Sequence, residues 1–326
     1  MLKEIKVVPL AEESFGVRSM CTYVETSDTK ILLDAGVSLA PKRMGYPPHP
    51  REYCALAMCR RKIVEAAEKA DVITISHYHF DHHTPSYTDW FTNWSSAEAA
   101  KQIYGGKLVL VKSYRSMVNA SQRRRGWMFK KTGGCYAKNL ETADGRLFRF
   151  GETILRFSDP VFHGPENSEL GWVLMASISY ADEKVVFASD VQGPMHVPTL
   201  DCILAEKPQL VIVGGPPTYL AGFKVADECI ELGLQNLKHL VENVPTTVLG
   251  HHILRDEQWR SHVQPVFDAA KENGNKVLTA AEYMGKANNF LEFRRMQLFE
   301  IEPPSIEFEK WLRMPLQRRK LEKPPI

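Results

Sequence analysis

Short runs of branched apolar residues, separated by turn residues, mark the first part of the chain. Residues 3–9, residues 18–25 and the segment that begins at Lys30 each have this composition, which predicts three strands with a hairpin between the last two. Apolar residues then recur at helical spacing from about 52 to 69, which predicts an amphipathic helix. This helix leads into an apolar, β-branched run at 71–76 that is typical of a buried strand.

The middle of the chain continues with a predicted short helix near 96–104 and a strand at 107–112. Residues 112–131 contain seven basic residues and no acidic one. Two further segments, 146–157 and 171–188, each have the pattern of two strands joined by a turn. Sheet and helix therefore alternate throughout this region.

In the last third, strands are predicted at 209–213, at 246–249 and from Lys276, with helices at about 224–242 and 256–273. Hairpins combined with strand–helix alternation in each half predict an α/β fold. The expected architecture is an αββα sandwich, in which two mixed β-sheets pack together and helices cover their outer faces.

Length and composition are those of a soluble globular protein. With 326 residues, 44% hydrophobic and 25% charged, the chain is long enough for a sizeable core. We expect one domain over 1–302, with an inserted segment at about 84–145, and a basic, proline-rich tail over 303–326. Because the formal net charge is only +2, any surface for nucleic acid must be local.

The sequence predicts a cytoplasmic protein with no membrane contact. Its N-terminus has charges where a signal peptide needs an apolar core, and no apolar run approaches the roughly 20 residues that span a bilayer. Six scattered cysteines, without a CxxC pair, are typical of reduced thiols rather than a disulfide framework.

The strongest chemical signal follows the strand at 71–76. His77, His79, Asp81 and His82 lie within six residues, and imidazole and carboxylate are ligands that catalytic zinc prefers. His77 and His79 are two residues apart, so on an extended chain they point the same way and can bind one ion. The alternative is a histidine-rich surface loop.

Five other polar residues also follow predicted strands. Asp34, His163 and Asp190 each stand at the end of an apolar run, and His251 and His252 follow the strand at 246–249. The carboxyl ends of strands are where an α/β sheet opens its site. We therefore expect these side chains to meet the histidine cluster.

Asp34, the 77–82 cluster, His163, Asp190 and the histidine pair, in this order, resemble the five motifs of the metallo-β-lactamase fold superfamily. The match covers about residues 30–252. SHYHFDHHTP and GHHILRD are similar to a largely archaeal branch of predicted metal-dependent hydrolases, which implies fold and metal chemistry but no substrate.

The resemblance implies two divalent ions, zinc first, with iron or manganese as alternatives. The first ion would bind His77, His79 and His163. The second would bind Asp81, His82 and the last-motif histidine, for which His251 is preferred over His252. Asp190 would bridge both ions, and Asp34 would orient a histidine ring. His83 is interpreted as a surface or supporting residue.

Two ions can hold one water between them, lower its pKa and stabilise an oxyanion on a phosphoryl or acyl centre, which gives Asp81 and Asp190 catalytic roles. An aspartate at position 190, where β-lactamases of the superfamily have cysteine, resembles the phosphodiesterase, lactonase and thioesterase branches. A histidine at position 79, where oxygen-reducing diiron relatives have glutamate, is evidence against redox chemistry.

The sequence therefore predicts a dinuclear metal-dependent hydrolase, with a phosphodiester in RNA or single-stranded DNA as the first substrate hypothesis. The candidate contacts to an anionic substrate are Arg123, Arg124 and Arg125, in a segment that also has aromatic residues, and Arg255. The alternatives are a solvated helix face for the basic segment and an ion pair on its own helix for Arg255. One alternative is a small-molecule ester, thioester or lactone hydrolase. A second is a metal-stabilised nucleic-acid-binding protein without turnover.

Overall fold

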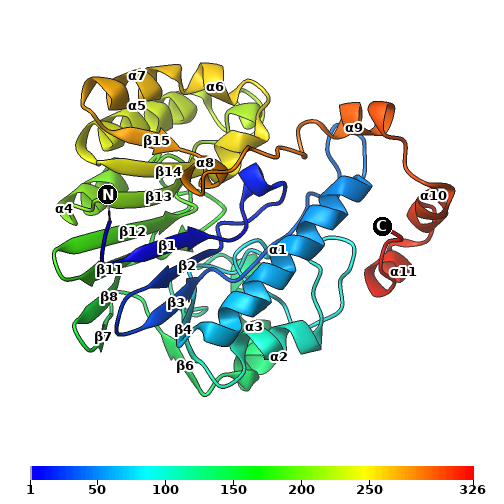
Figure 1. Cartoon of the computed structure of the whole chain (residues 1–326), viewed down its shortest axis with the longest axis horizontal. Coiled ribbons are helices and arrows are strands. Elements are labelled where there is room, and N and C mark those ends of the chain that lie inside the picture. The colour runs from blue at the N-terminus through cyan, green and yellow to red at the C-terminus, as the bar shows by residue number, and fades with distance from the viewer. Residues whose placement is uncertain (1) are drawn as a thin grey trace.

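Two β-sheets form the centre of the computed structural model, which describes residues 2–326 (Figure 1). The first has the strand order β1 (Lys6–Pro9), β2 (Thr22–Glu25), β3 (Lys30–Leu33), β4 (Val72–Ile75), β5 (Leu108–Val111) and β6 (Asn139–Thr142). β1 to β3 pair antiparallel, and β3 to β6 pair parallel.

The second sheet is also mixed. Its order is β15 (Lys276–Leu278), β14 (Thr246–Gly250), β13 (Leu210–Gly214), β12 (Glu183–Ser189), β11 (Ala176–Tyr180), β8 (Thr153–Phe157) and β7 (Leu147–Phe150). β15 to β12 are parallel and β12 to β7 antiparallel. A separate pair consists of β9 (Val161–Phe162) and β10 (Trp172–Val173).

Helices lie outside both sheets (Figure 1). With the first sheet are α1 (Pro50–Lys69), α2 (Ala97–Tyr104) and α3 (Ala120–Lys131), and with the second are α4 (Val197–Ala205), α5 (Asp227–Asn243), α6 (Trp259–His262) and α7 (Gln264–Glu272). The remaining helices are α8 (Ala280–Tyr283), α9 (Arg295–Ile301), α10 (Ile306–Leu312) and α11 (Leu316–Leu321). The predicted αββα architecture is confirmed.

Alternation along β12 explains how one strand serves two cores. Val185 and Phe187 belong to the inner core that the two sheets share, whereas Val186 and Ala188 belong to the outer core with α4, α5 and α7. Successive side chains of a strand point to opposite faces, so a strand that is covered on both faces is apolar without interruption.

Most predicted elements are present, with changes at their ends. The predicted helix at 256–273 is divided into α6 and α7, because Pro265 occupies the first turn of α7 and lacks the N–H that a continuous helix needs. α4 and β6 were not predicted. The segment at 84–145 includes β5 and β6, so this part of the chain completes the first sheet.

The residues after Pro303 pack against the same core. Phe308 and Trp311 are at most 2% exposed, and both contact the ring of Tyr53 on α1. The segment 303–326, predicted as a basic, proline-rich tail, thus includes side chains that are part of the core. Over the described residues, no helix is long and apolar enough to cross a membrane.

Candidate metal centre

Polar side chains gather where strands of both sheets end. Asp34 directly follows β3, His77 lies two residues after β4, and Asp190 directly follows β12. His163 follows β9 and His251 follows β14. The two sheets thus bring together residues that are more than 200 positions apart in the chain.

A first cluster consists of His77, His79, His163 and Asp190, whose potential ligand atoms all lie within 4.8 Å of one another. His77 Nε2 is 3.1 Å from His79 Nδ1, and His163 Nε2 is 2.8 Å from Asp190 Oδ2. His79 is half-buried and the other three are buried. One side of this cluster is therefore open to solvent.

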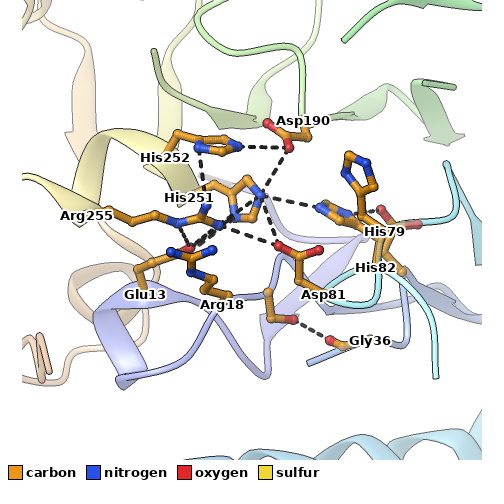
Figure 2. A network of polar contacts seen from close by, with 12 residues as sticks. Glu13, Arg18, Gly36, His79, Asp81, His82, Asp190, His251, His252 and Arg255 are labelled. Carbon is orange, nitrogen blue, oxygen red and sulfur yellow. Dashed lines mark hydrogen bonds and ion pairs between the residues drawn. The ribbon is translucent and has the colours of Figure 1, made fainter. Parts of the chain in front are cut away.

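A second group lies beside the first. Asp81, His82 and His251 form one set of ligand atoms within 4.8 Å, and Asp190, His251 and His252 form another. Asp190 Oδ2 lies 3.2 Å from His251 Nε2, so this carboxylate contacts both groups (Figure 2). Asp190 thus occupies the position expected for a bridging ligand.

The donor atoms fit divalent ions. Nitrogens bound to a tetrahedral zinc at about 2.0–2.1 Å lie about 3.4 Å apart, and His82 Nε2 and His251 Nε2 are 3.4 Å apart. Within residues 2–326, Asp190 Oδ1 is buried without a hydrogen-bond partner. Buried polar atoms are costly unless something binds them.

Two carboxylates fix the orientation of the histidines in the second group. His82 Nδ1 donates to Asp34 Oδ2 (2.7 Å), and Ser76 N–H donates to Asp34 Oδ1 (2.7 Å). His251 Nδ1 lies 3.1 Å from Glu13 Oε1. Each ring then has its Nε2 lone pair directed at the cluster, as in metal sites with carboxylate–histidine pairs. Asp34 thus contacts His82 directly, and it also forms a set of potential ligand atoms with His77 and His82; its predicted supporting role stays a prediction.

The electrostatics favour the ligand forms of His77, His79, Asp81 and Asp190, whereas Glu13 and Asp190 outweigh burial at His251 and raise its pKa to about 10. Burial, reinforced by the neighbouring histidines, holds the pKa of His77 and of His79 well below the usual range. Burial would raise the pKa of Asp81 and of Asp190, but the surrounding histidines outweigh it and lower both. Neutral imidazoles and ionised carboxylates are the species that bind metals.

The structure corrects the role predicted for Arg255. Its side chain is 3% exposed and pairs with Glu13 at 2.7 Å, while Nη2 lies 3.5 Å from Asp81 Oδ2 (Figure 2). A guanidinium that is buried against two carboxylates is not free to bind substrate. Arg255 instead holds Asp81, and it holds Glu13 behind His251.

Glu12 and Glu13 are site residues that the sequence did not reveal. Glu12 Oε1 accepts the backbone N–H of His251 (2.8 Å), and a Cβ at position 250 would lie 2.4 Å from that oxygen, so Gly250 is required there. Burial, with Glu13 beside it, raises the pKa of Glu12 to about 8. Both glutamates precede β2 and match no metal-binding spacing, so no sequence signal pointed to them.

The remaining histidines differ in position. His83 belongs to none of the ligand clusters; its Nδ1 donates to the carbonyl of His79 (2.9 Å). It is buried, as a supporting residue rather than a surface one. His252 is more exposed than His251, and its Nε2 lies 3.1 Å from Asp190 Oδ2.

The backbone is strained at several of these positions. Asp34, Ser189, Gln192 and His251 all have positive φ angles, between 48° and 60°. Such conformations are uncommon for residues other than glycine and cost on the order of 1–3 kcal/mol each. They gather at sites where the surrounding structure enforces a functional geometry.

The predicted arginines lie on α3, which packs above the histidine loop. Arg123 and Arg124 are exposed, whereas Arg125 is half-buried, with Nη1 3.4 Å from the carbonyl of Tyr78. The guanidinium of Arg125 stacks on the ring of Phe80 at 4.6 Å. α3 thus brings basic side chains next to the loop that contains His79 and Asp81.

An αββα sandwich with paired His/Asp clusters at its strand ends defines an α/β protein with a candidate dinuclear metal site. No family model matches the chain. It is 44% identical over 294 residues to a UPF0282 protein of Methanopyrus kandleri, covering 90% of this chain and 99% of the relative. UPF0282 proteins of Pyrobaculum neutrophilum and Korarchaeum cryptofilum are 45% and 40% identical, covering 91% and 94% of this chain and 95% and 99% of theirs. The chain belongs to the UPF0282 family, and these relatives are archaeal, as the resemblance implied.

Solved structures are similar only at a low level. The diiron β-hydroxylase CmlA of Streptomyces venezuelae gives a TM-score of 0.46 at 11% identity, covering 86% of this chain and 53% of CmlA. The short form of human tRNase Z gives 0.42 at 11% identity, covering 75% of this chain and 92% of that protein. Similarities of this size are evidence for neither the fold nor the function of this chain. The fold is therefore taken from the chain's own topology, and the candidate site from its own side chains.

Proposed function

We propose that this protein is a dinuclear metal-dependent hydrolase that cleaves phosphodiesters in RNA or single-stranded DNA. The main support is the position of Asp190, which lies between two groups of potential ligands with one oxygen 2.8 Å from His163 and 3.2 Å from His251. A carboxylate that reaches both groups can contact two adjacent ions.

In this proposal His77, His79 and His163 would hold the first ion, Asp81, His82 and His251 would hold the second, and Asp190 would contact both. The bound ions would activate water at neutral pH and stabilise negative charge on the phosphoryl oxygens. The protein's own contribution is to hold its donors in place: Asp34 orients His82, and Glu13 orients His251.

The phosphodiester hypothesis is supported by the outer surface of α3. This surface has an open groove of about 520 Å³, lined by Tyr114, Arg115, Arg123, Arg124 and Trp127. Trp127 is 48% exposed, although a tryptophan is usually buried. Cations that neutralise phosphates beside rings that stack on bases are the features of single-strand binding sites.

A turnover panel tests the proposal. Purified protein is loaded with zinc, manganese or iron and assayed on a generic phosphodiester, labelled single-stranded RNA and DNA, a thioester and a lactone. Zinc is expected to support phosphodiester cleavage that His79→Ala abolishes, while His239→Ala, an exposed histidine on α5, retains it. Acyl cleavage alone would assign the protein to small-molecule ester, thioester or lactone hydrolysis.

A second experiment separates nuclease from simple phosphodiesterase. The double variant Arg123→Glu/Arg124→Glu is expected to weaken oligonucleotide cleavage, whereas Lys238→Glu on exposed α5 is not. Figure 1 shows α5 and α3 at opposite ends of the molecule. Oligonucleotide binding that survives His79→Ala, without turnover in any metal, would identify a metal-stabilised binding protein instead.

A further inference from the structure

A second hollow lies on the other side of α3 from the groove. It has a volume of about 430 Å³ between α3 and the loop that follows the histidine cluster, and its wall includes Phe80, Tyr87, Arg124, Arg125 and Phe129. This volume is within the range of small-molecule sites. Arg124 lines both hollows, so the two are neighbours.

The lining of this pocket suits a planar group next to negative charge. Phe80 and Tyr87 meet edge to face with ring centroids 5.9 Å apart, and the guanidinium of Arg125 covers Phe80. Two arginines contribute to the wall, and none of the described residues that line it is acidic. Tyr87 and Met128 remain 43% and 45% exposed, so apolar surface is open to a ligand.

The pocket is connected to the candidate metal centre through one short loop. Phe80 lies between the potential ligands His79 and Asp81 in the chain, and His83, which also lines the pocket, directly follows His82. Side chains of this loop are thus divided between the metal side and the pocket side. A ligand in the pocket lies beside the residues that would hold the ions.

We infer that this pocket binds the base of a nucleotide unit whose phosphodiester lies at the metal centre, with Tyr87 stacking on the base and Arg124 and Arg125 facing the phosphates. The inference rests on the proposed function and adds to it the class of substrate. Aromatic rings beside arginines are the means by which proteins bind single-stranded bases without reading a sequence.

Binding of 2-aminopurine riboside 5′-monophosphate tests the pocket directly. This mononucleotide contains no phosphodiester to cleave, and its fluorescence is quenched when the base stacks. We expect quenching by the wild-type protein and a rise in Kd of roughly tenfold in Tyr87→Ala, since one stacked base contributes about that much. Tyr180→Ala, at the tip of the β11–β12 hairpin, is the matched control and should bind like the wild type.

Ribose 5-phosphate separates recognition of the base from recognition of phosphate alone. It is expected to compete poorly with the fluorescent mononucleotide. Equal competition, an unchanged Kd in Tyr87→Ala or an absence of quenching would each overturn the inference.

Turnover distinguishes failure of the pocket from failure of the proposed function. The assay compares thymidine 5′-(p-nitrophenyl phosphate) with bis(p-nitrophenyl) phosphate, which has no base. We expect the ratio of their kcat/KM values to favour the nucleotide and to fall about tenfold in Tyr87→Ala. Cleavage of both esters with an unaltered ratio would refute the pocket alone. If neither is cleaved, the proposed function fails, and the binding experiment still decides whether the pocket takes a base.

Discussion

Replacement of Asp34 by asparagine should weaken the second metal site without changing any of the residues assigned to the two ions. Asp34 Oδ1 accepts the N–H of Ser76, and Oδ2 accepts from His82 Nδ1 and from the hydroxyls of Ser76 and Ser189. If the asparagine carbonyl remains on Ser76 N–H, its NH₂ group faces His82 Nδ1. His82 must then move its proton to Nε2, which is the atom that faces His251.

The size of the effect follows from this change of tautomer. Loss of a partner that orients a ligating histidine typically lowers metal affinity 10–100-fold. Because the ion binds only the folded protein, a tenfold rise in Kd lowers the stability of the saturated protein by about 1.4 kcal/mol. The opposite amide orientation places NH₂ against Ser76 N–H and leaves a buried donor unpaired, which also destabilises by about 1–3 kcal/mol.

Competition with a chromophoric chelator, together with the metal content per chain, measures the affinity of each site. In Asp34→Asn we expect the more weakly bound of the two ions to be lost first. Asp28→Asn is the matched control, because Asp28 Oδ2 also accepts backbone N–H groups, from Glu152 and Thr153, but away from the site. An affinity in Asp34→Asn equal to that of the control would refute the proposed orientation of His82.

Two further predictions concern stability. Burial would raise the pKa of Glu292, but Arg18 at 2.5 Å outweighs it and lowers that pKa to about 2. The ionised carboxylate thus contributes on the order of 3 kcal/mol to the free energy of unfolding above pH 4.5. This contribution is lost as the pH falls through about 2. In urea unfolding, Glu292→Gln should therefore have a lower free energy of unfolding than wild type at pH 7, and this difference should become smaller below pH 4.5. A difference that does not depend on pH, or one equal to that of exposed Glu309→Gln, would contradict this prediction. Trp311→Ala should destabilise the protein by about 3–5 kcal/mol because the ring is buried. Leu321→Ala should change the stability little because Leu321 is exposed. Equal effects of the two substitutions would show that the residues after Pro303 are not part of the core.

The fold could be predicted largely because its strands are buried and continuously apolar. Runs such as 209–213 and 246–249 are covered on both faces, so their composition marks them as strands, and the second leads to His251, which the structure places at the site. β6 could not be predicted in the same way. It is an edge strand with exposed and half-buried residues, and therefore has no continuous apolar pattern.

Some residues of the candidate site could likewise be predicted from the sequence, and others could not. Residues that directly follow strands, such as Asp34 and Asp190, could be identified because the sheet determines where they point. Glu12 and Glu13 could not, because they lie in a one-turn segment whose role depends on contact with residues 251–255. Arg255 was assigned to substrate for the same reason: its partner Glu13 is 242 positions away.

The choice between His251 and His252 depends on contacts that their adjacent positions in the sequence cannot reveal. His251 Nε2 lies near Asp81, His82 and Asp190, and its Nδ1 is held by Glu13, whereas the set of ligands around Asp81 and His82 does not include His252. We therefore expect His251→Ala to retain one metal ion per chain and His252→Ala to retain two, as measured by elemental analysis after gel filtration. Far-ultraviolet circular dichroism controls for folding of both variants. Loss of an ion in His252→Ala, with two ions retained in His251→Ala, would reverse the assignment.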